Sequence, residues 1–177
     1  MNLVVWGLGK HANNKILPAI KRSNKFNLYG VCSRNNDSVE RVKRSYKTKG
    51  WISSIEMFED KNIDAIYLST PPALHKMQAD SILDNNLHLL CEKPITTSHE
   101  DTAQLVEKAI SKKLSLMEGL MYLYHPQLTR VKNFIQSGSN NHIRSIICRF
   151  GKWNCNVTCI FIHAHNRIRK LHDRRCV

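Results

Sequence analysis

The strongest constraint on the fold is a glycine-rich hexapeptide that follows the first apolar run of the chain. Residues 3–6 (LVVW) predict a buried strand, and residues 7–12 (GLGKHA) come directly after it and begin a helix. In a G-x-G-x-x-A pattern the first glycine makes a tight turn, the second lets a pyrophosphate approach the backbone, and the small third residue packs helix on strand. The helix N-terminus adds N–H donors. The pattern favours a nucleotide-phosphate site over a structural turn, with Gly7, Leu8, Gly9, Lys10, His11 and Ala12 as its residues.

Short apolar runs alternate with segments of helical length along most of the chain. Continuous apolar runs are typical of strands buried on both faces, and they occupy residues 28–32, 65–69, 87–91 and 114–117. Between the last two, residues 98–113 predict a helix with Ser98 as its N-cap. The apolar positions of one face of this helix are Ala103, Val106, Ala109 and Ile110. This alternation predicts an α/β fold with a doubly wound parallel sheet.

The charge of the chain suggests a phosphorylated or polyanionic partner, because the formal net charge is +13. Residues 1–50 hold eleven basic and two acidic side chains, residues 51–150 ten and eleven, and residues 151–177 six and one. The basic side chains that could track nucleic-acid phosphates are Lys21, Arg22, Lys25, Arg41, Lys43, Arg44, Lys47 and Lys49. No helix-turn-helix, zinc-finger or RNA-binding aromatic motif accompanies them, so we expect solvated helix faces and no nucleic-acid partner.

Neither a membrane segment nor a leader is expected. The apolar runs are far shorter than the roughly 18 residues of a spanning helix. The chain opens directly into strand-like sequence, without a charged and apolar leader. Without a leader, the six cysteines are expected to be reduced thiols, which predicts a cytoplasmic protein.

The turn after the second expected strand bears on the choice between NADP and NAD. An acidic residue there usually holds the ribose hydroxyls of NAD. Residues 32–37 read CSRNND, so the hydroxyl of Ser33 is followed by the guanidinium of Arg34. Arg34 suits bidentate contact with a 2′-phosphate, which favours NADP as the cofactor. Two alternatives stay open: Asp37 turns inward as the acid, or Arg34 is an ordinary solvated loop residue.

Further motifs follow the later strands. They read STPPALH at residues 69–75, CEKP at 91–94, MEG at 117–119 and YHPQ at 124–127. Together with the glycine turn they resemble the Gfo/Idh/MocA family of NAD(P)-dependent oxidoreductases, over about residues 2–150. The resemblance implies a Rossmann domain and hydride transfer between nicotinamide and a hydroxyl or carbonyl carbon of a sugar or polyol. It also implies oligomers among full-length members.

The same resemblance implies roles for individual residues. Thr70, Pro71 and His75 would line the nicotinamide side of the cofactor groove, and Glu92 would lie near the nicotinamide ribose. Lys93 would be the catalytic lysine that hydrogen-bonds the substrate oxygen. The carboxyl ends of parallel strands are where open α/β sheets bind ligands, and a lysine there can donate to a developing alkoxide. The alternatives are a solvated Lys93 and a structural His75.

The resemblance ends before the chain does. We expect a Rossmann domain over residues 1–125, the start of a truncated substrate domain over 126–150 with a strand at 143–150, and an irregular tail over 151–177. Asp173 lies at the distance of a catalytic aspartate of the family, but the glycines that precede that aspartate are absent, so we do not expect it to act. The tail concentrates cysteines, histidines and basic residues without a period, which suggests out-of-frame sequence.

Other functions remain as alternatives. One is a catalytically inactive nucleotide-binding remnant of such an enzyme, and the other is a basic nucleic-acid-binding protein. A metal site is not expected in the tail, although Cys155, Cys159, His163 and His165 are metal-binding residue types. Their spacing lacks the stretch of roughly twelve residues that lets a zinc finger fold around its metal.

Overall fold

The computed structural model describes residues 1–137 and the backbone of residues 145–152, 155–164 and 167–170. The chain divides into two compact units, Met1–Leu120 and Met121–Val177. The first unit contains the glycine turn and the motifs around Thr70 and Lys93. Its boundary at Leu120 lies slightly before the expected end of the Rossmann domain.

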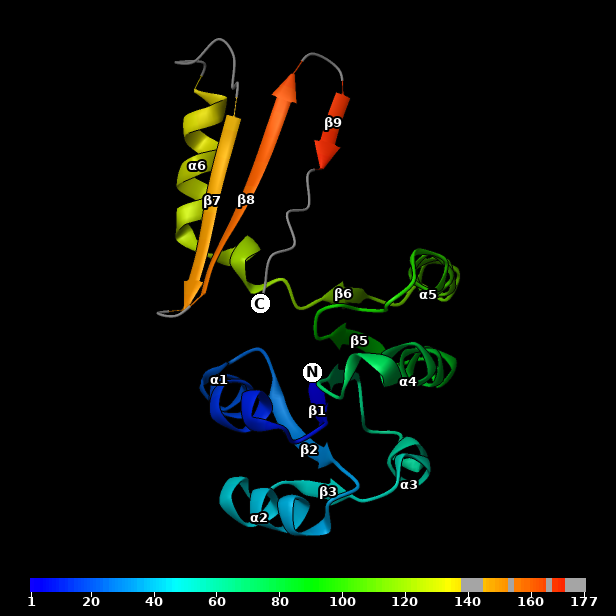
Figure 1. Cartoon of the computed structure of the whole chain (residues 1–177). Helices are drawn as coiled ribbons and strands as arrows, with labels where there is room; N and C mark the ends of the chain where they lie inside the picture. The colour runs from blue at the N-terminus through cyan, green and yellow to red at the C-terminus, as the bar shows by residue number, and fades with distance from the viewer. Residues whose placement is uncertain (138–144, 153–154, 165–166, 171–177) are drawn as a thin grey trace. The chain divides into compact units, whose positions relative to one another are not determined.

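A six-stranded parallel sheet forms the centre of the first unit (Figure 1), with the order β3-β2-β1-β4-β5-β6. The strands are β1 (Asn2–Trp6), β2 (Asn27–Cys32), β3 (Lys49–Trp51), β4 (Ala65–Leu68), β5 (His88–Cys91) and β6 (Leu116–Glu118). The expected doubly wound α/β fold is confirmed. Of the strands of this sheet, only β3 has no counterpart among the predicted strands, because its sequence KGW contains no continuous apolar run. The order reverses between β1 and β4, where sheets of this kind bind ligands.

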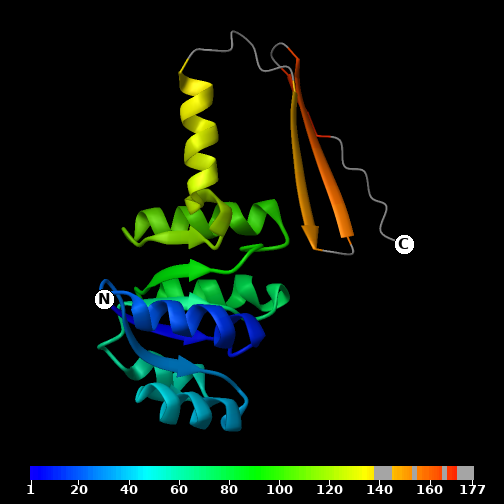
Figure 2. The ribbon, with the colours of Figure 1, turned by 90° about the vertical axis from the view of Figure 1, so that its left-hand side faces the viewer.

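Helices cover both faces of the sheet (Figures 1 and 2). One face carries the π-helical turn η1 (Ala12–Ile16), α1 (Leu17–Arg22) and α2 (Asn36–Tyr46), and the other carries α3 (Ser54–Glu59), α4 (Pro72–Asp84) and α5 (His99–Ser111). Leu3 and Val5 belong to the apolar core on the first face, and Val4 and Trp6 to the core on the second. Successive side chains of a strand point to opposite faces, so this one apolar run supplies both cores.

The predicted helix over residues 98–113 is α5, and its predicted cap is confirmed: the Ser98 hydroxyl accepts a hydrogen bond from the Asp101 N–H at 3.3 Å. Of the four apolar positions that share the expected face, only Ala109 is buried. Leu105 is completely buried, whereas Val106 is 42% and Ile110 71% exposed. Ala103 is exposed as well. Leu105 and Ala109 share the face of α5 that packs into the core, because the neighbouring helix α4 lies on that side. An ion pair between Asp80 of α4 and Lys108 of α5, at 2.8 Å, joins the two helices.

The second unit differs from the sequence expectation at its end. Its described elements are η2 (Met121–Tyr124), α6 (Pro126–Gln136), β7 (Ser145–Lys152), β8 (Cys155–Ala164) and β9 (Arg167–Lys170). The last three form an antiparallel sheet in the order β7-β8-β9. β7 corresponds to the strand expected at 143–150, of which residues 143 and 144 lie outside the described residues. The region expected to be irregular thus contains β8 and β9, and the β-branched and aromatic residues of β8 favour a strand there. His165 and Asp173 lie outside the described residues.

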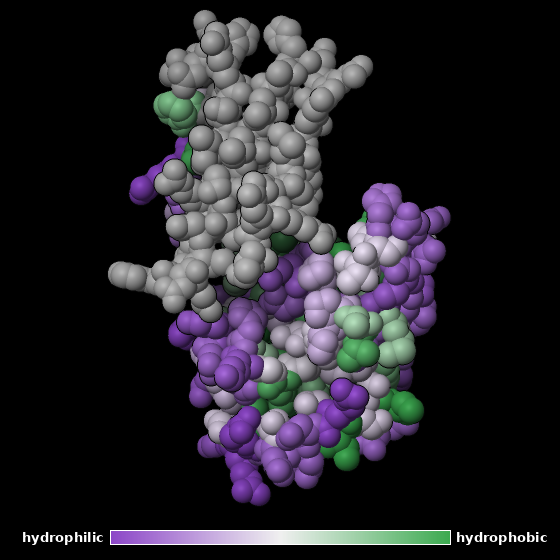
Figure 3. All heavy atoms as spheres, viewed as in Figure 1, coloured by the Kyte–Doolittle hydropathy of each residue, from purple (hydrophilic) through white to green (hydrophobic). Residues whose placement is uncertain are grey.

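The surface of the first unit in the view of Figure 3 is mainly hydrophilic, with separate hydrophobic patches. Several basic residues of the first fifty have partners within the chain. Lys43 pairs with Glu40 at 2.6 Å, Lys49 pairs with Asp60 at 2.7 Å, and the Lys21 ammonium lies 5.5 Å from the centre of the Tyr46 ring. Of the helices that the structure describes, none is long and apolar enough to span a membrane.

Candidate dinucleotide site

The glycine turn begins between the carboxyl ends of β2 and β4. Gly7 has a φ of +104°, and a Cβ built on it would lie 2.6 Å from the carbonyl oxygen of Ser69. The Gly7 N–H donates to the carbonyl oxygen of Cys32 at 2.9 Å. Another residue at position 7 would meet both backbone strain and a steric clash, so this glycine is required by the turn itself.

Gly9 is different, because a Cβ built there meets nothing within 4 Å. The space above the Gly9 backbone is open to an approaching group, as a pyrophosphate site requires. Ala12 is completely buried beneath the turn. The side-chain amide of Asn13 donates to the carbonyl oxygens of Leu8 and Gly9 at 2.6 and 2.9 Å, which holds the turn in place. Sequence reasoning missed Asn13, although an asparagine just inside a helix is a recognised donor to nearby backbone.

A groove of about 980 Å³ follows the carboxyl ends of β1, β2 and β4, a size typical of cofactor sites. The predicted residues that line it are Gly7, Leu8, Gly9, Ser33, Arg34, Thr70 and Pro71. The predicted residues that are not part of its lining are Lys10, His11, Ala12, His75, Glu92 and Lys93. The groove therefore brings together the glycine turn, the residues expected at a 2′-phosphate and part of the Thr70 motif.

The end of the groove beyond β2 is built around the start of α2. The Asn35 side chain caps this helix by accepting a hydrogen bond from the Ser38 N–H at 2.8 Å, and the Ser33 hydroxyl accepts from the Asn35 N–H at 3.3 Å. Among the described residues that line the groove, Arg34 is the one cation and none is a carboxylate. Asp37 lies outside this lining and borders a separate surface with Arg41. This chemistry suits a bound phosphate.

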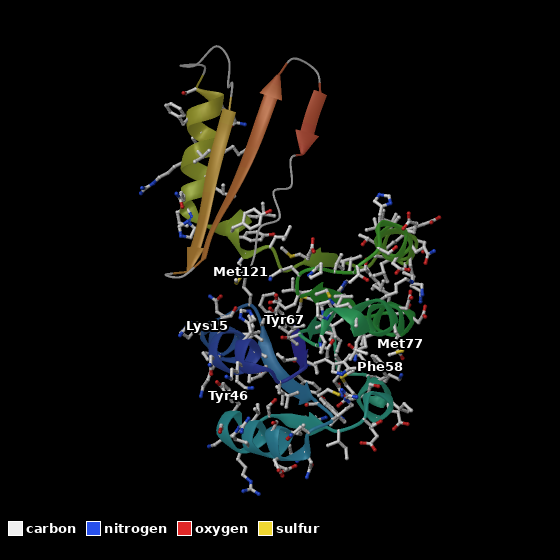
Figure 4. All side chains as sticks on the ribbon, viewed as in Figure 1. Lys15, Tyr46, Phe58, Tyr67, Met77 and Met121 are labelled. Atoms are coloured by element: carbon white, nitrogen blue, oxygen red, sulfur yellow. The ribbon has the colours of Figure 1, made fainter. Side chains whose placement is uncertain are left out.

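Exposed apolar side chains form a further wall of the groove, and sequence reasoning missed them. Ile52 and Ile55 come from the connection after β3 and the start of α3, and Met77 comes from α4. They are 53%, 73% and 63% exposed. Met77 of α4 and Phe58 of α3 lie on the same side of the sheet (Figure 4). The one signal in the sequence was the Ser53 cap, whose hydroxyl accepts from the Ile55 N–H at 3.2 Å and so begins α3 here.

Glu92 links the end of β5 to β4 and to the glycine turn. The buried Tyr67 of β4, which Figure 4 places within the first unit, donates its hydroxyl to Glu92 Oε1. Burial, together with the hydrogen bond to Glu92, raises the pKa of Tyr67 above its usual range. His11 Nε2 lies 3.1 Å from the same oxygen. That contact has the distance of an ion pair but lacks hydrogen-bond alignment, so the buried His11 Nε2 is left without a hydrogen-bond partner.

Lys93 and His75 occupy opposite environments. Lys93 is exposed after β5, and its N–H donates to Glu92 Oε2 at 3.3 Å. The Lys93–Pro94 peptide bond is cis. His75 was expected to line the groove, but its ring is completely buried, with both nitrogens against backbone carbonyl oxygens. Its position on the inner face of α4 places it beneath the groove, which corrects that expectation.

Two cysteine thiols lie at strand ends near the site. Burial, reinforced by Glu56, raises the pKa of Cys32 to about 12. Burial, reinforced by Glu118 and Glu92, raises the pKa of Cys91 to about 12 as well. Both thiols are thus protonated at neutral pH and serve as apolar packing groups. In the described part of the chain, no group of histidines, cysteines or carboxylates is arranged to hold a metal ion.

Comparisons with known proteins agree with this geometry. The sequence model of an oxidoreductase family with an NAD-binding Rossmann fold, named GFO_IDH_MocA, matches residues 1–120. The dTDP-3,4-didehydro-2,6-dideoxy-alpha-D-glucose 3-reductase of Saccharopolyspora spinosa is 31% identical over 147 residues, which cover 83% of this chain and 44% of that protein. The D-xylose 1-dehydrogenase (NADP(+)) 2 of Haloferax volcanii is 29% identical over 123 residues, covering 69% and 38%. The chain spans less than half the length of these relatives.

Solved structures show the same likeness. A 3-ketoreductase from Actinomadura kijaniata in complex with NADP and TDP-benzene has a TM-score of 0.77 at 28% identity, over 83% of this chain and 46% of that one. An apo scyllo-inositol dehydrogenase from Lactobacillus casei has a TM-score of 0.74 at 18% identity, over 83% and 45%. The second likeness is one of fold alone.

Proposed function

Since the chain belongs to the Gfo/Idh/MocA oxidoreductase family, with its NAD-binding Rossmann fold over residues 1–120, we propose that the groove binds NADP(H) in preference to NAD(H). We propose further that the protein transfers hydride between the nicotinamide and a hydroxyl or carbonyl carbon of a small sugar or polyol. The observation that carries the proposal is the glycine turn. The close approach of Ser69 requires a glycine at position 7, whereas the backbone of Gly9 stays accessible to a bound group. A turn of this kind at the switch point of a parallel sheet fits a pyrophosphate.

Different residues of the groove would bind different parts of the dinucleotide. Backbone N–H groups of residues 7–9 would hold the pyrophosphate, with Lys10 adding positive charge beside the turn. Ser33 and Arg34 would hold the 2′-phosphate, since a guanidinium can bind phosphate through two parallel hydrogen bonds. The apolar wall of Ile52, Ile55 and Met77 would pack against the adenine ring, which removes exposed apolar surface from water.

Hydride transfer would take place on the Thr70 and Pro71 side of the groove, whereas Glu92 and Lys93 lie outside the groove lining. Bound nicotinamide supplies a hydride donor or acceptor at its C4. Thr70 and Pro71 would border the nicotinamide, and Glu92, held by Tyr67, would lie near its ribose together with His11. Lys93 would donate a hydrogen bond from its ammonium to the substrate oxygen, stabilising the negative charge that develops there as hydride leaves or arrives.

The names of the relatives support a sugar or polyol as substrate, because they act on a dTDP-sugar, on xylose and on scyllo-inositol. We propose that the protein binds a small molecule and not a nucleic acid. Lys21, Lys43 and Lys49 interact with side chains of the chain itself, which agrees with this proposal. The free, buried thiols of Cys32 and Cys91 agree with a reducing, cytoplasmic setting. We propose that full-length members of the family form oligomers.

A Gly9→Val substitution tests the cofactor site. A Cβ at this position meets no protein atom within 4 Å, so we expect the melting temperature to stay within about 2 °C of wild type. It fills the space that a pyrophosphate needs, so we expect NADPH affinity to fall at least about tenfold, or about 1.4 kcal/mol. NADPH fluorescence titration measures the affinity.

Ala103→Val, which adds the same side chain on the exposed face of α5, is the matched control and should leave NADPH affinity unchanged. Equal NADPH affinity in Gly9→Val and wild type would contradict the proposed site. Turnover with a panel of sugars and polyols then separates an enzyme from a protein that binds the nucleotide without activity.

A further inference from the structure

The segment that bears Lys93 is held by side chains from two other elements. His75 of α4 places Nδ1 2.8 Å from the carbonyl oxygen of Pro94. Glu118 at the end of β6 accepts a hydrogen bond from the Ile95 N–H through Oε1 at 2.9 Å. These two contacts fall on the two residues that directly follow the lysine. Pro94 and Ile95, which follow Lys93, are thereby held against α4 and β6 of the Rossmann core.

The second ring nitrogen of His75 reaches the groove wall. Nε2 lies 2.8 Å from the carbonyl oxygen of Thr70, and the hydroxyl of the same threonine donates to Gln78, one turn further along α4. His75 is completely buried and Gln78 is 8% exposed. A neutral imidazole donates to one carbonyl at a time, and an imidazolium donates to both. In either state His75 contacts both Thr70, which lines the groove, and Pro94, which follows Lys93.

This arrangement matters because Lys93 itself is a long side chain in solvent. A lysine has four rotatable bonds, so the position of its backbone decides which volume its ammonium can reach. A displacement of about 1 Å between reacting groups can cost about a hundredfold in rate. A fixed distance between Thr70 in the groove wall and the backbone of Lys93 would therefore favour catalysis. Core packing alone does not require such a fixed distance.

We propose that Glu118 and His75 are positioning residues for Lys93, with Glu118 holding the segment after the lysine and His75 setting its register against Thr70. The proposal rests on the proposed function, because it assigns a purpose to the position of the substrate lysine. Neither side chain lines the groove. Their loss should therefore disturb Lys93 without removing the phosphate contacts that hold the cofactor.

The test compares Glu118→Ala with Glu118→Gln in the full 177-residue chain. Glutamine keeps a side-chain oxygen that can accept from the Ile95 N–H, and alanine does not. Residue-resolved hydrogen exchange measures the Ile95 amide, and the ¹³C signal of dimethylated lysine, assigned by Lys93→Arg, reports the surroundings of Lys93. Glu107→Ala removes an exposed glutamate of α5 and is the matched control.

In Glu118→Ala we expect Ile95 exchange to accelerate at least about tenfold and the Lys93 signal to move, with NADPH affinity within about threefold of wild type. Glu118→Gln should restore both signals, and Glu107→Ala should change neither. If Glu118→Ala does not melt cooperatively, Glu118→Asp replaces it, because aspartate keeps the charge but is one methylene too short to reach Ile95.

His75 is tested by a pair of substitutions that each keep one of its contacts. The amide nitrogen of asparagine stands near the place of Nδ1 and that of glutamine near the place of Nε2. We expect each substitution to shift the Lys93 signal, because each breaks one end of the link between Thr70 and Pro94. A wild-type signal in both would overturn the role of His75. His99→Gln, at the exposed start of α5, is the control.

The two proposals fail in different ways. An unchanged Lys93 signal and unchanged Ile95 exchange in Glu118→Ala, with NADPH still bound, would overturn the positioning role alone. A wild-type chain that does not bind NADPH would overturn the proposed function, whatever the exchange of Ile95 shows.

Discussion

At the scale of single residues, Arg34 is the group on which we propose that cofactor choice depends. It lies in the groove lining beside Ser33, and no carboxylate of the described lining competes with it for a phosphate. Asp37, the acid that could have favoured NAD, belongs to the first turn of α2 and borders another surface. The type of both residues was visible in the sequence. Which of the two faces the groove was decided by where α2 begins.

Replacing Arg34 by alanine should separate the two cofactors. Loss of a charge-assisted contact with the 2′-phosphate should weaken NADPH binding by about tenfold to a hundredfold, while NADH affinity changes less than about twofold. Competition titrations with both dinucleotides at constant salt measure the two affinities. Arg41→Ala, an arginine of α2 on the other surface, serves as control. A parallel loss for NADPH and NADH would show that Arg34 does not bind the 2′-phosphate.

At the scale of elements, α5 shows how a well-predicted helix can present an unpredicted face. Its cap at Ser98 depends on residues that are neighbours in the sequence, so local chemistry was sufficient to identify it. Its buried face depends on where α4 lies across the sheet. The positions 103, 106 and 110 form an apolar stripe by spacing, yet the stripe lies in solvent and Leu105 enters the core.

A pair of truncations on α5 checks this assignment. Leu105→Ala removes a completely buried side chain and should lower the free energy of unfolding by about 2–4 kcal/mol. Ile110→Ala removes a side chain that is 71% exposed and should change it by about 0.5 kcal/mol or less. Urea unfolding followed by circular dichroism gives both values. Equal losses, or a larger loss for Ile110, would mean that α5 packs with the opposite face.

At the scale of the whole molecule, Asp60 joins the loop after α3 to the neighbouring strands β2 and β3. The carboxylate accepts from Lys49 of β3 at 2.7 Å, from the Tyr29 hydroxyl of β2 at 3.0 Å and from the Asn62 N–H at 3.0 Å. The hydrogen bond from Lys49 is the main cause that holds the pKa of Asp60 well below its usual range. Because the folded carboxyl binds its proton less readily than the unfolded one, folding is favoured while Asp60 is ionised.

This linkage makes a prediction for acid stability. The contribution is present in full above about pH 5 and is lost as the pH falls below about 4, where the unfolded chain takes up the proton first. Asp60→Asn removes the titration, so its melting temperature should fall less between pH 7 and pH 3 than that of wild type. Asp37→Asn, at an exposed position of α2, is the control. Identical pH profiles for Asp60→Asn and wild type would refute the link.

The parts of this protein that depend on neighbours in the sequence were determined by the sequence itself. They are the buried strands of the sheet, the glycine turn, the cap of α5 and the residue types at the proposed phosphate contacts. The tertiary structure alone decided that His75 is buried between Thr70 and Pro94, that Glu118 reaches Ile95, and that Ile52 and Met77 share a groove wall. The physical reason is distance along the chain. Turns and caps are bonded within a few residues, whereas burial and contact between elements arise only when β4, β5 and β6 are brought side by side.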